Sequence, residues 1–454
     1  MASYDYDLFV IGVGSGGVRA ARMSAQYGAR VATAEEKYMG GTCVNVGCVP
    51  KKLFVYASHY SEDYQQAEGF GWDKAAPGFN WPTLLNNKNT EISRLNGVYK
   101  GLLDTAGVTH FDGRARIVDK HHIAIGDTTV STERILIATG SWPVVPEFSG
   151  NEHVITSNEA FFLEQLPRRC LVVGGGYIAV EFAGIFHGLG VDTKLSYRGP
   201  LFLRHFDIDI RETVREELQK KNIDLMFETN VSAIEKKEDG TLRVIFKEGN
   251  ELETDLVLYA TGRESAVKDI GLENVNVETR ENGSIIVDEE FRTSEENIFA
   301  LGDVIGHMQL TPVAIEEAMC FANTQFLGER KVIDYSNIAT AVFCQPNVGT
   351  VGLTENEARE SCEEIDIYRS SFRPMKHTLS GSDERFMMKL IVDRKTDKVL
   401  GVHMVGSDAG EIIQGISIAM KMGVTKTLFD STIGIHPTTA EEFVTMREPV
   451  PVEK

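Results

Sequence analysis

Two glycine-rich turns constrain the fold of this chain more than any other feature of its sequence. The first begins at Gly12, directly after the apolar run 6–11, and residues 18–27 beyond it have helical composition. The second begins at Gly174, after another apolar run, and leads into a helical stretch over residues 180–189. A strand, a tight glycine turn and a helix form the opening unit of a Rossmann-type domain. The chain is therefore predicted to be an α/β protein with two Rossmann-like domains.

The rest of the chain is divided by two apolar strands that end in Ala-Thr-Gly, at Gly140 and Gly262. They bracket the second glycine turn, which predicts an inserted domain. The apolar run 298–303 ends in Gly-Asp and indicates that the chain returns to the first sheet. Beyond it, alternating apolar strands and a helix over residues 409–422 indicate a separate α+β unit. The expected domains are residues 1–145 with 263–334, residues 146–262, and residues 335–454.

Composition narrows the function classes. The chain has 42% hydrophobic and 25% charged residues, which is typical of a globular protein, and it lacks a long uncharged apolar run. Its formal net charge of -20 repels nucleic acid and anionic lipid, so neither is an expected partner. The N-terminal segment shows no basic region or signal cleavage site, and a cytoplasmic location is expected.

The first glycine turn carries the residues of a dinucleotide site. Gly12, Gly14 and Gly17 let the backbone approach a pyrophosphate, which then lies at the positive end of the following helix. Glu35 closes the next strand, where a carboxylate accepts hydrogen bonds from ribose hydroxyls. A purely structural turn is the alternative, but the strand before it and the helix after it favour dinucleotide binding.

The second glycine turn differs in a way that indicates a phosphorylated nucleotide. Ala179 stands at the third glycine position, and no carboxylate closes the following strand, 193–197. Arg198 and Arg204 follow instead, and planar guanidinium groups suit a 2′-phosphate that a carboxylate would repel. The alternative is that both are solvated loop arginines. The pattern favours NADPH over NADH.

Cys43 and Cys48 are the only closely spaced cysteines. Structural zinc generally needs four ligands, and no matching Cys/His pair is evident, so no metal is expected. A cytosolic disulfide is mainly catalytic or sensing, and this pair follows a predicted cofactor turn. Lys51 lies three residues beyond the pair and would favour the thiolate. The other cysteines are expected to be buried apolar residues: Cys170, Cys320, Cys344 and Cys362.

A histidine near the C-terminus is a candidate proton donor. His436 is followed by Glu441, a carboxylate placed to orient an imidazole. A lone loop histidine is usually structural. Here the nearby glutamate, and a thiol chemistry that needs a proton shuttle, favour the catalytic interpretation.

Taken together, these segments resemble the pyridine nucleotide-disulfide oxidoreductase family over nearly the whole chain. The motifs that carry the resemblance are GGTCVNVGCVPKK, GGGYIAVEFAGIF, YRGPLFLRHFD, ALGDV, LTPVA and HPTTAEEFVTMR. The resemblance implies FAD and NADPH as cofactors, glutathione disulfide as substrate, and a homodimer with shared active sites. It also implies that residues 335–454 form the dimerisation domain.

The resemblance assigns roles to individual residues. Cys48 would face the flavin, while Cys43 would exchange with the substrate. His436 of the second subunit, held by Glu441, would protonate the departing thiol. The residues expected beside the nicotinamide and flavin are Tyr177, which would swing aside, and the paired Lys51 and Glu181. The expected FAD residues are Gly12, Gly14, Ser15, Gly16, Gly17, Glu35, Thr42, Lys51, Ala115, Gly140, Asp303 and Thr311. The expected NADPH residues are Gly174, Gly175, Gly176, Ile178, Glu181, Arg198, Arg204 and Gly262.

The substrate side leaves an alternative open. Two cations, Arg19 and Arg22, favour an anionic disulfide such as that of glutathione. Met319, however, stands where many members of the family that act on glutathione disulfide have an arginine, while ATGSWP and LSGSDERF resemble relatives that reduce trypanothione disulfide. Another low-molecular-weight disulfide, trypanothione-like or a modified glutathione, is therefore the rival substrate. The expected substrate residues are Ser15, Arg19, Arg22, Tyr99 and Glu442.

Other branches of the family fit less well. The chain ends in EPVPVEK, without the extra thiol or selenol pair of mercuric reductases and large thioredoxin reductases. Lipoamide dehydrogenase typically has an acid where Tyr197 stands. A flavoprotein that binds both cofactors but acts as a redox sensor or structural partner is the remaining alternative, from a different class.

Overall fold

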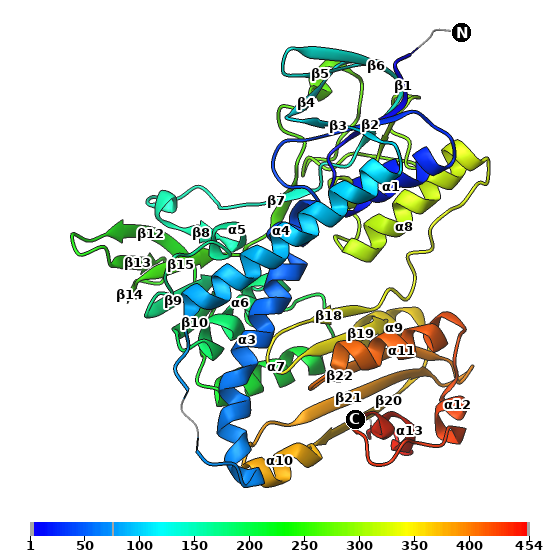
Figure 1. The fold of residues 1–454 in the computed structure, drawn as a ribbon. Helices are drawn as coiled ribbons and strands as arrows, with labels where there is room; N and C mark the ends of the chain where they lie inside the picture. Colours follow the sequence, from blue (N-terminus) through cyan, green and yellow to red (C-terminus); the bar gives the residue numbers. More distant parts are fainter. Residues whose placement is uncertain (1–3, 75–76, 452–454) are drawn as a thin grey trace.

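The computed structural model describes residues 4–74 and 77–451 (Figure 1). The residues outside these ranges are 1–3 and 75–76, which fall in the expected first domain, and 452–454, which include the end of the EPVPVEK segment. No helix among the described residues is long and apolar enough to cross a membrane.

The first sheet is built around the strand that precedes the first glycine turn. Strand β1 (Tyr6–Ile11) is parallel to β2 on one side and to β6 on the other. This strand is central and is covered on both faces, and a strand in such a position must be apolar throughout. Its residues Leu8, Phe9 and Val10 accordingly have no exposed surface. The strand order is β3-β2-β1-β6-β5-β4, and β17 also pairs with β6. The strand bounds are Val31–Glu35 (β2), Thr109–Asp112 (β3), Ala115–Asp119 (β4), His122–Ile125 (β5), Thr128–Ile137 (β6) and Ile298–Ala300 (β17).

Strand β17 comes from far along the chain, so the polypeptide returns to its first sheet after building a second one. The second sheet is parallel, in the order β11-β10-β9-β15-β8. Its strands are Ile155–Thr156 (β8), Arg169–Val173 (β9), Asp192–Tyr197 (β10), Asp224–Phe227 (β11) and Leu256–Tyr259 (β15). An antiparallel sheet beside it contains Val231–Lys236 (β12), Leu242–Phe246 (β13) and Glu251–Thr254 (β14). The two crossings between the bodies pair as Ser141–Pro143 (β7) and Arg263–Ser265 (β16).

The third body is an antiparallel sheet in the order β18-β19-β22-β21-β20. Figure 1 shows it at the opposite end of the molecule from the first sheet, with helix α11 against it. Its strands are Thr340–Val342 (β18), Val348–Gly352 (β19), Ile365–Phe372 (β20), Phe386–Asp393 (β21) and Val399–Val405 (β22).

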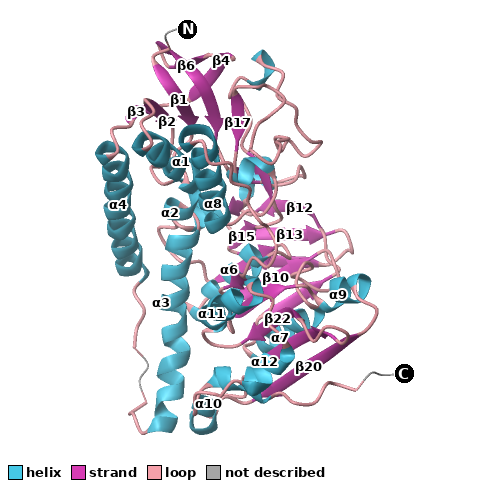
Figure 2. Cartoon of the chain, turned by 90° about the vertical axis from the view of Figure 1, so that its right-hand side faces the viewer, coloured by secondary structure: helices cyan, strands magenta, loops and turns pink. Residues whose placement is uncertain are grey.

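Helices cover these sheets. Helix α1 packs against α8, and α3 runs along the molecule to reach α10 (Figure 2). The α-helix bounds are Ser15–Gln26 (α1), Gly41–Asn45 (α2), Cys48–Ala67 (α3), Trp81–Thr105 (α4), Ser157–Ala160 (α5), Tyr177–Gly188 (α6), Ile208–Lys220 (α7), Thr311–Ala322 (α8), Glu355–Ser361 (α9), Met375–Ser380 (α10), Ala409–Lys421 (α11), Lys426–Ser431 (α12) and Glu442–Thr445 (α13). Shorter 3-10 turns are Glu68–Phe70, Asn151–His153, Leu272–Asn274, Gly302–Ile305 and Thr439–Glu441, and Asn323–Leu327 is a π-helical turn.

The solitary cysteines follow their expected burial with one exception. Cys170, Cys320 and Cys344 are buried in apolar clusters. Cys362 is partly exposed, so the prediction that it is buried was wrong. It follows the short helix α9 directly, at the point where the chain leaves the helix, and only part of its surface packs against the core.

Candidate active site

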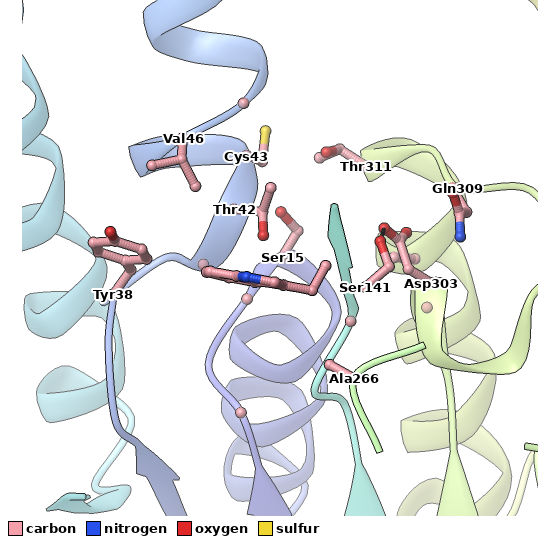
Figure 3. Close-up of a pocket in the computed structure, with 18 of the residues that line it drawn as sticks. Ser15, Tyr38, Thr42, Cys43, Val46, Ser141, Ala266, Asp303, Gln309 and Thr311 are labelled. Atoms are coloured by element: carbon pink, nitrogen blue, oxygen red, sulfur yellow. Dashed lines mark hydrogen bonds between the residues drawn. The ribbon is translucent and has the colours of Figure 1, made fainter. Parts of the chain in front are cut away.

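A cavity of about 950 Å³ lies where the first glycine turn, helices α2 and α3 and the start of α8 meet. Figure 3 shows Ser15, Thr42 and Cys43 on one side of it and Asp303 and Thr311 on the other. Most of the residues predicted to bind FAD line this cavity. They are Gly12, Gly14, Ser15, Gly16, Glu35, Thr42, Lys51, Ala115, Gly140, Asp303 and Thr311.

The first glycine turn has a geometry that only glycine tolerates at two positions. Gly12 has a φ of +97°, and a Cβ there would lie 2.6 Å from the carbonyl oxygen of Ala138. A Cβ on Gly17, which does not line the cavity, would lie 2.0 Å from the carbonyl oxygen of Gly12. Helix α1 can therefore begin against the strand, and its first residues, Ser15 and Gly16, line the cavity. This is the anion-binding end of a helix.

Glu35 closes the side of the cavity next to this turn. Its Oε2 accepts a hydrogen bond from the Val13 N–H at 3.0 Å, and its Oε1 accepts one from the Lys37 N–H at 3.0 Å. A carboxylate oxygen has capacity for further donors, such as ribose hydroxyls. Glu35 therefore joins the turn to the wall that an adenosine would contact.

The wall opposite Glu35 contains a chain of hydrogen-bonded side chains, of which only Asp303 was predicted from the sequence. Ser141 Oγ donates to Asp303 Oδ2 at 2.6 Å, and the Arg263 guanidinium donates to Ser141 Oγ at 2.8 Å. Ser141 and Arg263 directly follow the two Ala-Thr-Gly strand ends, which was the available signal. The chain fixes the Asp303 carboxylate at the cavity edge.

The two spaced cysteines lie at the cavity, on α2 and at the first residue of α3. Cys48 Sγ is 3.8 Å from Thr311 Oγ1. The hydrogen bond from the Cys43 thiol is the largest cause that lowers the pKa of Cys48, to about 6, and Thr311 and Lys51 add to it against the cost of burial. The same contact raises the pKa of Cys43. In the reduced pair the thiolate therefore belongs to Cys48.

The charge beside Cys48 comes from an ion pair between two bodies. Lys51 Nζ lies 2.7 Å from Glu181 Oε1, and only 13% and 2% of the two side chains are exposed. Glu181, on α6, also accepts a hydrogen bond from the Phe343 N–H at 2.8 Å, and Lys51 lies 4.2 Å from the Phe343 ring centroid. Three segments far apart in sequence thus hold one ammonium beside the cavity, and this is the pairing that the resemblance implies.

A pH titration tests this arrangement. In the reduced protein, the Cys48 thiolate should persist down to about pH 6, because its folded pKa lies below the ordinary value of 9. Lys51→Met removes a positive charge and should move the midpoint upward, whereas Lys100→Met, on the exposed face of α4, should leave it unchanged. The measurement is the pH dependence of Cys48 alkylation, followed by mass spectrometry. An unshifted Cys48 midpoint near 9 in the unmodified protein would contradict the assignment.

The second glycine turn lies outside the large cavity. A Cβ on Gly174, whose φ is +150°, would lie 2.3 Å from the carbonyl oxygen of Ala260, and the Tyr197 ring lies against Gly175. Arg198 and Arg204 are exposed in the loop after β10, and neither forms an ion pair among the described residues. Gly176 caps the start of α6 in extended backbone, and Gly262 lies at the crossing into β16. The residues that join this turn to the cavity are Tyr177, Ile178 and Glu181.

The predicted substrate side lies around α1 and α4. Tyr99 lies against Gly40, next to the cysteine segment, and Arg19 donates to Met319 Sδ at 3.8 Å. Burial and the nearby Cys43 raise the pKa of Tyr99, while Arg19 opposes that shift. Arg22 Nε is buried without a hydrogen-bond partner among the described residues. Tyr99, Arg19 and Cys43 therefore share one region.

His436 is not brought to the cysteines within one chain. Its Nδ1 lies 3.1 Å from Glu441 Oε1, and 80% of its side chain is exposed. Figure 1 places α13, which begins at Glu442, at the far end of the molecule from α1 and α8. The imidazole is oriented and open to solvent, so a second molecule can reach it. Among the described residues, no three His, Cys, Asp or Glu side chains gather as a metal site.

Comparison with known proteins decides the family. The model of the pyridine nucleotide-disulphide oxidoreductases matches residues 6–318, and the model of their dimerisation domain matches residues 338–447. The chain belongs to this family. The oxidoreductase is 49% identical to a glutathione reductase from Burkholderia cepacia over 98% of its own length and 99% of the relative's.

Two further relatives bear on the open question of substrate. The oxidoreductase is 46% identical to a glutathione reductase from Nostoc sp., over 98% of its own length and 100% of the relative's. It is 43% identical to a trypanothione reductase from Leishmania donovani, over 98% and 96% of the two chains. The relatives named as glutathione reductases are thus the more similar, by a small margin.

Proposed function

We propose that this oxidoreductase is a homodimer that uses FAD and NADPH to reduce glutathione disulfide to two molecules of glutathione. One observation carries the proposal. The Cys43–Cys48 pair has the Lys51–Glu181 ion pair beside Cys48, and Tyr99 and Arg19 near Cys43. The dithiol lies between the cofactor cavity and a cationic surface. This position suits the transfer of electrons from a cofactor in the cavity to an anionic disulfide bound at the cationic surface.

The cavity fits FAD. Gly12 and Gly17 let the turn bend tightly, because a Cβ at either position would collide with backbone, and a pyrophosphate site at a helix start needs such a turn; Glu35 retains acceptor capacity for a ribose. Asp303 and Thr311 hold the other end of the cavity. When bound, FAD would accept a hydride from NADPH and supply two electrons to the disulfide.

The protein's own steps follow from the two thiol pKa directions. Two electrons break the Cys43–Cys48 bond and leave a thiolate on Cys48 and a proton on Cys43. Cys43 gives its proton to the partner subunit's His436, and its sulfur attacks one sulfur of the substrate, so a mixed disulfide forms and one glutathione thiolate departs. The partner subunit's His436 returns that proton to the departing thiolate. The Cys48 thiolate then attacks the Cys43 sulfur, which restores the internal disulfide and expels the second glutathione as a thiolate that takes up a proton from solvent.

The proton donor requires two subunits. His436 lies on the dimerisation domain and does not line the cavity that contains Cys43 and Cys48 of its own chain, and Glu441 holds the Nδ1 side of its ring. The Nε2 side has no hydrogen-bond partner among residues 4–74 and 77–451 and can face a substrate sulfur across the subunit interface. Each active site thus combines the thiols of one chain with the imidazole of the other.

A trypanothione-like or modified glutathione disulfide is the second candidate substrate. Met319 supports this candidate, because a thioether cannot pair with a carboxylate of the substrate. The Met319 sulfur also accepts a hydrogen bond from Arg19. Arg19 and Arg22 on α1 argue the other way, since two cations disfavour the cationic trypanothione. We therefore place glutathione disulfide first. The thiol chemistry belongs in a reducing compartment, and we propose the cytoplasm.

Thiol counting separates a reductase from a passive sensor. Anaerobic addition of NADPH to the oxidised holoprotein, with no disulfide substrate present, should expose two further alkylatable cysteines per chain, Cys43 and Cys48. The measurement is mass spectrometry after alkylation. NADH should act more slowly at equal concentration. If NADPH produced no new thiol in native protein, a cofactor-binding protein without turnover would be the better account.

The loop arginines predict the nucleotide preference. Arg204→Met should raise the Kd of NADPH at least about tenfold, because a charged hydrogen bond contributes roughly 1.5 to 3 kcal/mol, and Arg198→Met should act in the same direction. The Kd of NADH should change little. Isothermal titration of both nucleotides checks this, with Arg168→Met, an exposed arginine before β9, as the matched control. Equal weakening of NADPH and NADH would contradict the assignment.

A further inference from the structure

A lysine with no exposed side-chain surface lies in the middle of β21, in the third body. Lys389 Nζ donates to Asp207 at 2.8 Å, to Asp209 at 2.6 Å and to Glu355 at 2.7 Å. Asp207 and Asp209 belong to the second body, at the start of α7, whereas Lys389 and Glu355 belong to the third. One buried ammonium therefore joins two bodies of the molecule.

The ions around Lys389 balance. Arg369 pairs with Asp209, and Arg359 pairs with Glu355 at 2.7 Å. Three cations (Lys389, Arg359 and Arg369) thus face three carboxylates (Asp207, Asp209 and Glu355). A buried charge without a partner is strongly unfavourable, so removal of Lys389 leaves Asp207, which also has no exposed side-chain surface, uncompensated. The cluster of Lys389 with Asp207, Asp209 and Glu355 therefore fixes the two bodies to each other only while its central cation is present. We call this cluster the anchor.

This anchor holds the end of the arginine loop. Asp207 caps α7 by accepting from the Asp209 N–H at 3.0 Å, and its second oxygen accepts from the Glu355 N–H at 2.9 Å. Residues 198–207 run from the end of β10 to this cap and carry both loop arginines, Arg198 and Arg204. Only two residues lie between Arg204 and Asp207, so a shift of the cap moves the guanidinium.

The middle of the loop is itself constrained and strained. Leu203 has a φ of +55°, in the left-handed region that branched side chains rarely adopt. Its N–H donates to the Gly175 carbonyl of the second glycine turn at 2.7 Å, and Arg211 donates to the Phe202 carbonyl at 2.8 Å. A strained loop keeps one conformation only while its ends are held. Lys389 fixes the end of the loop that leads into α7, through its ion pair with Asp207.

We propose that Lys389 is a positioning residue for nucleotide selectivity, which acts from the third body by fixing the loop that presents Arg198 and Arg204. This inference rests on the proposed function, in which those arginines bind the 2′-phosphate of NADPH. A guanidinium binds phosphate well only when its planar donors are aligned with the oxygens. Loss of the anchor should therefore weaken recognition of the 2′-phosphate and spare the rest of the nucleotide.

The test uses two probes that differ only in that phosphate. Isothermal titration of the FAD-loaded protein with adenosine 2′,5′-bisphosphate and with 5′-AMP gives the two association constants. The affinity ratio is the constant for the bisphosphate divided by the constant for 5′-AMP. Lys389→Met should lower this ratio about tenfold, the size of one charged hydrogen bond. Asp209→Asn, which keeps the helix cap and the central lysine, should lower it by less. Lys426→Met removes another buried lysine of the third body, one that pairs with Asp430, and should leave the ratio unchanged.

Hydrogen exchange gives a readout that does not depend on binding. The amides of Leu203 and Phe206, which are bonded within the loop and to the glycine turn, should exchange faster in Lys389→Met and Asp209→Asn than in Lys426→Met. If Lys389→Met fails to fold, Asp209→Asn decides by the same two measurements. An unchanged ratio and unchanged exchange in the folded variants would overturn the inference. A native protein that binds both probes equally would instead overturn the proposed use of NADPH.

Discussion

Replacement of Cys43 by serine should lower the turnover of glutathione disulfide by at least about a thousandfold, because a hydroxyl cannot form the mixed disulfide. Cys48→Ser should have an effect of the same order, since the oxidised pair cannot form and the mixed disulfide has no internal thiolate to resolve it. NADPH oxidation at saturating disulfide is the measurement. Cys362→Ser is the matched control, because Cys362 is partly exposed and does not line the cavity.

The cysteine variants should retain the first half of the reaction. NADPH should still reduce ferricyanide through the flavin in Cys43→Ser and Cys48→Ser at a rate within a few-fold of the native rate. This result separates loss of the thiols from loss of the cofactor site. Glutathione disulfide turnover within tenfold of native in either variant would remove the pair from the mechanism.

His436→Gln should slow disulfide turnover by about 10² to 10⁴, the usual contribution of a general acid, and should spare flavin reduction by NADPH. Glu441→Gln should have a smaller effect in the same direction, because it weakens the orientation of the ring and removes no donor. Stopped-flow measurement of the two half-reactions checks the split. Equal slowing of both halves would contradict the assigned role.

Mixing two inactive variants tests whether the imidazole comes from the second subunit. Cys43→Ser and His436→Gln chains, refolded or exchanged together in equal amounts, should recover roughly one quarter of the native activity. Half of the dimers formed at random are mixed, and each mixed dimer has one complete site out of two. If His436 acted on its own chain's cysteines, no mixed dimer would contain a complete site and the activity would stay at background.

The local units of the fold were predictable from sequence because their signals are local. Strand β1 covers residues 6–11 as expected, since a central parallel strand is a continuous apolar run. The helices after both glycine turns begin earlier than predicted, at Ser15 and Tyr177. Glycine weakens a helix signal in sequence. At Gly17, however, it is what lets the helix lie against the turn.

Contacts between distant segments were predictable only where a motif marks them. The pairing of Lys51 with Glu181 was implied by the family resemblance, whereas the Arg263–Ser141–Asp303 chain and the Lys389 cluster were not anticipated. A lysine within an apolar strand gives no sign of which carboxylates will surround it. Sequence also gave no measure of the partial exposure of Cys362, because that depends on how the end of α9 packs.

The most direct test of the central claim is the substrate profile of the purified holoprotein. Steady-state kcat/KM should be highest for NADPH with glutathione disulfide, within the range of about 10⁴ to 10⁸ M⁻¹s⁻¹ that is usual for enzymes. NADH should give a much lower value, and trypanothione disulfide should be a poor substrate because Arg19 and Arg22 repel its positive charge. A far higher kcat/KM for trypanothione disulfide or for a modified glutathione disulfide would contradict the account.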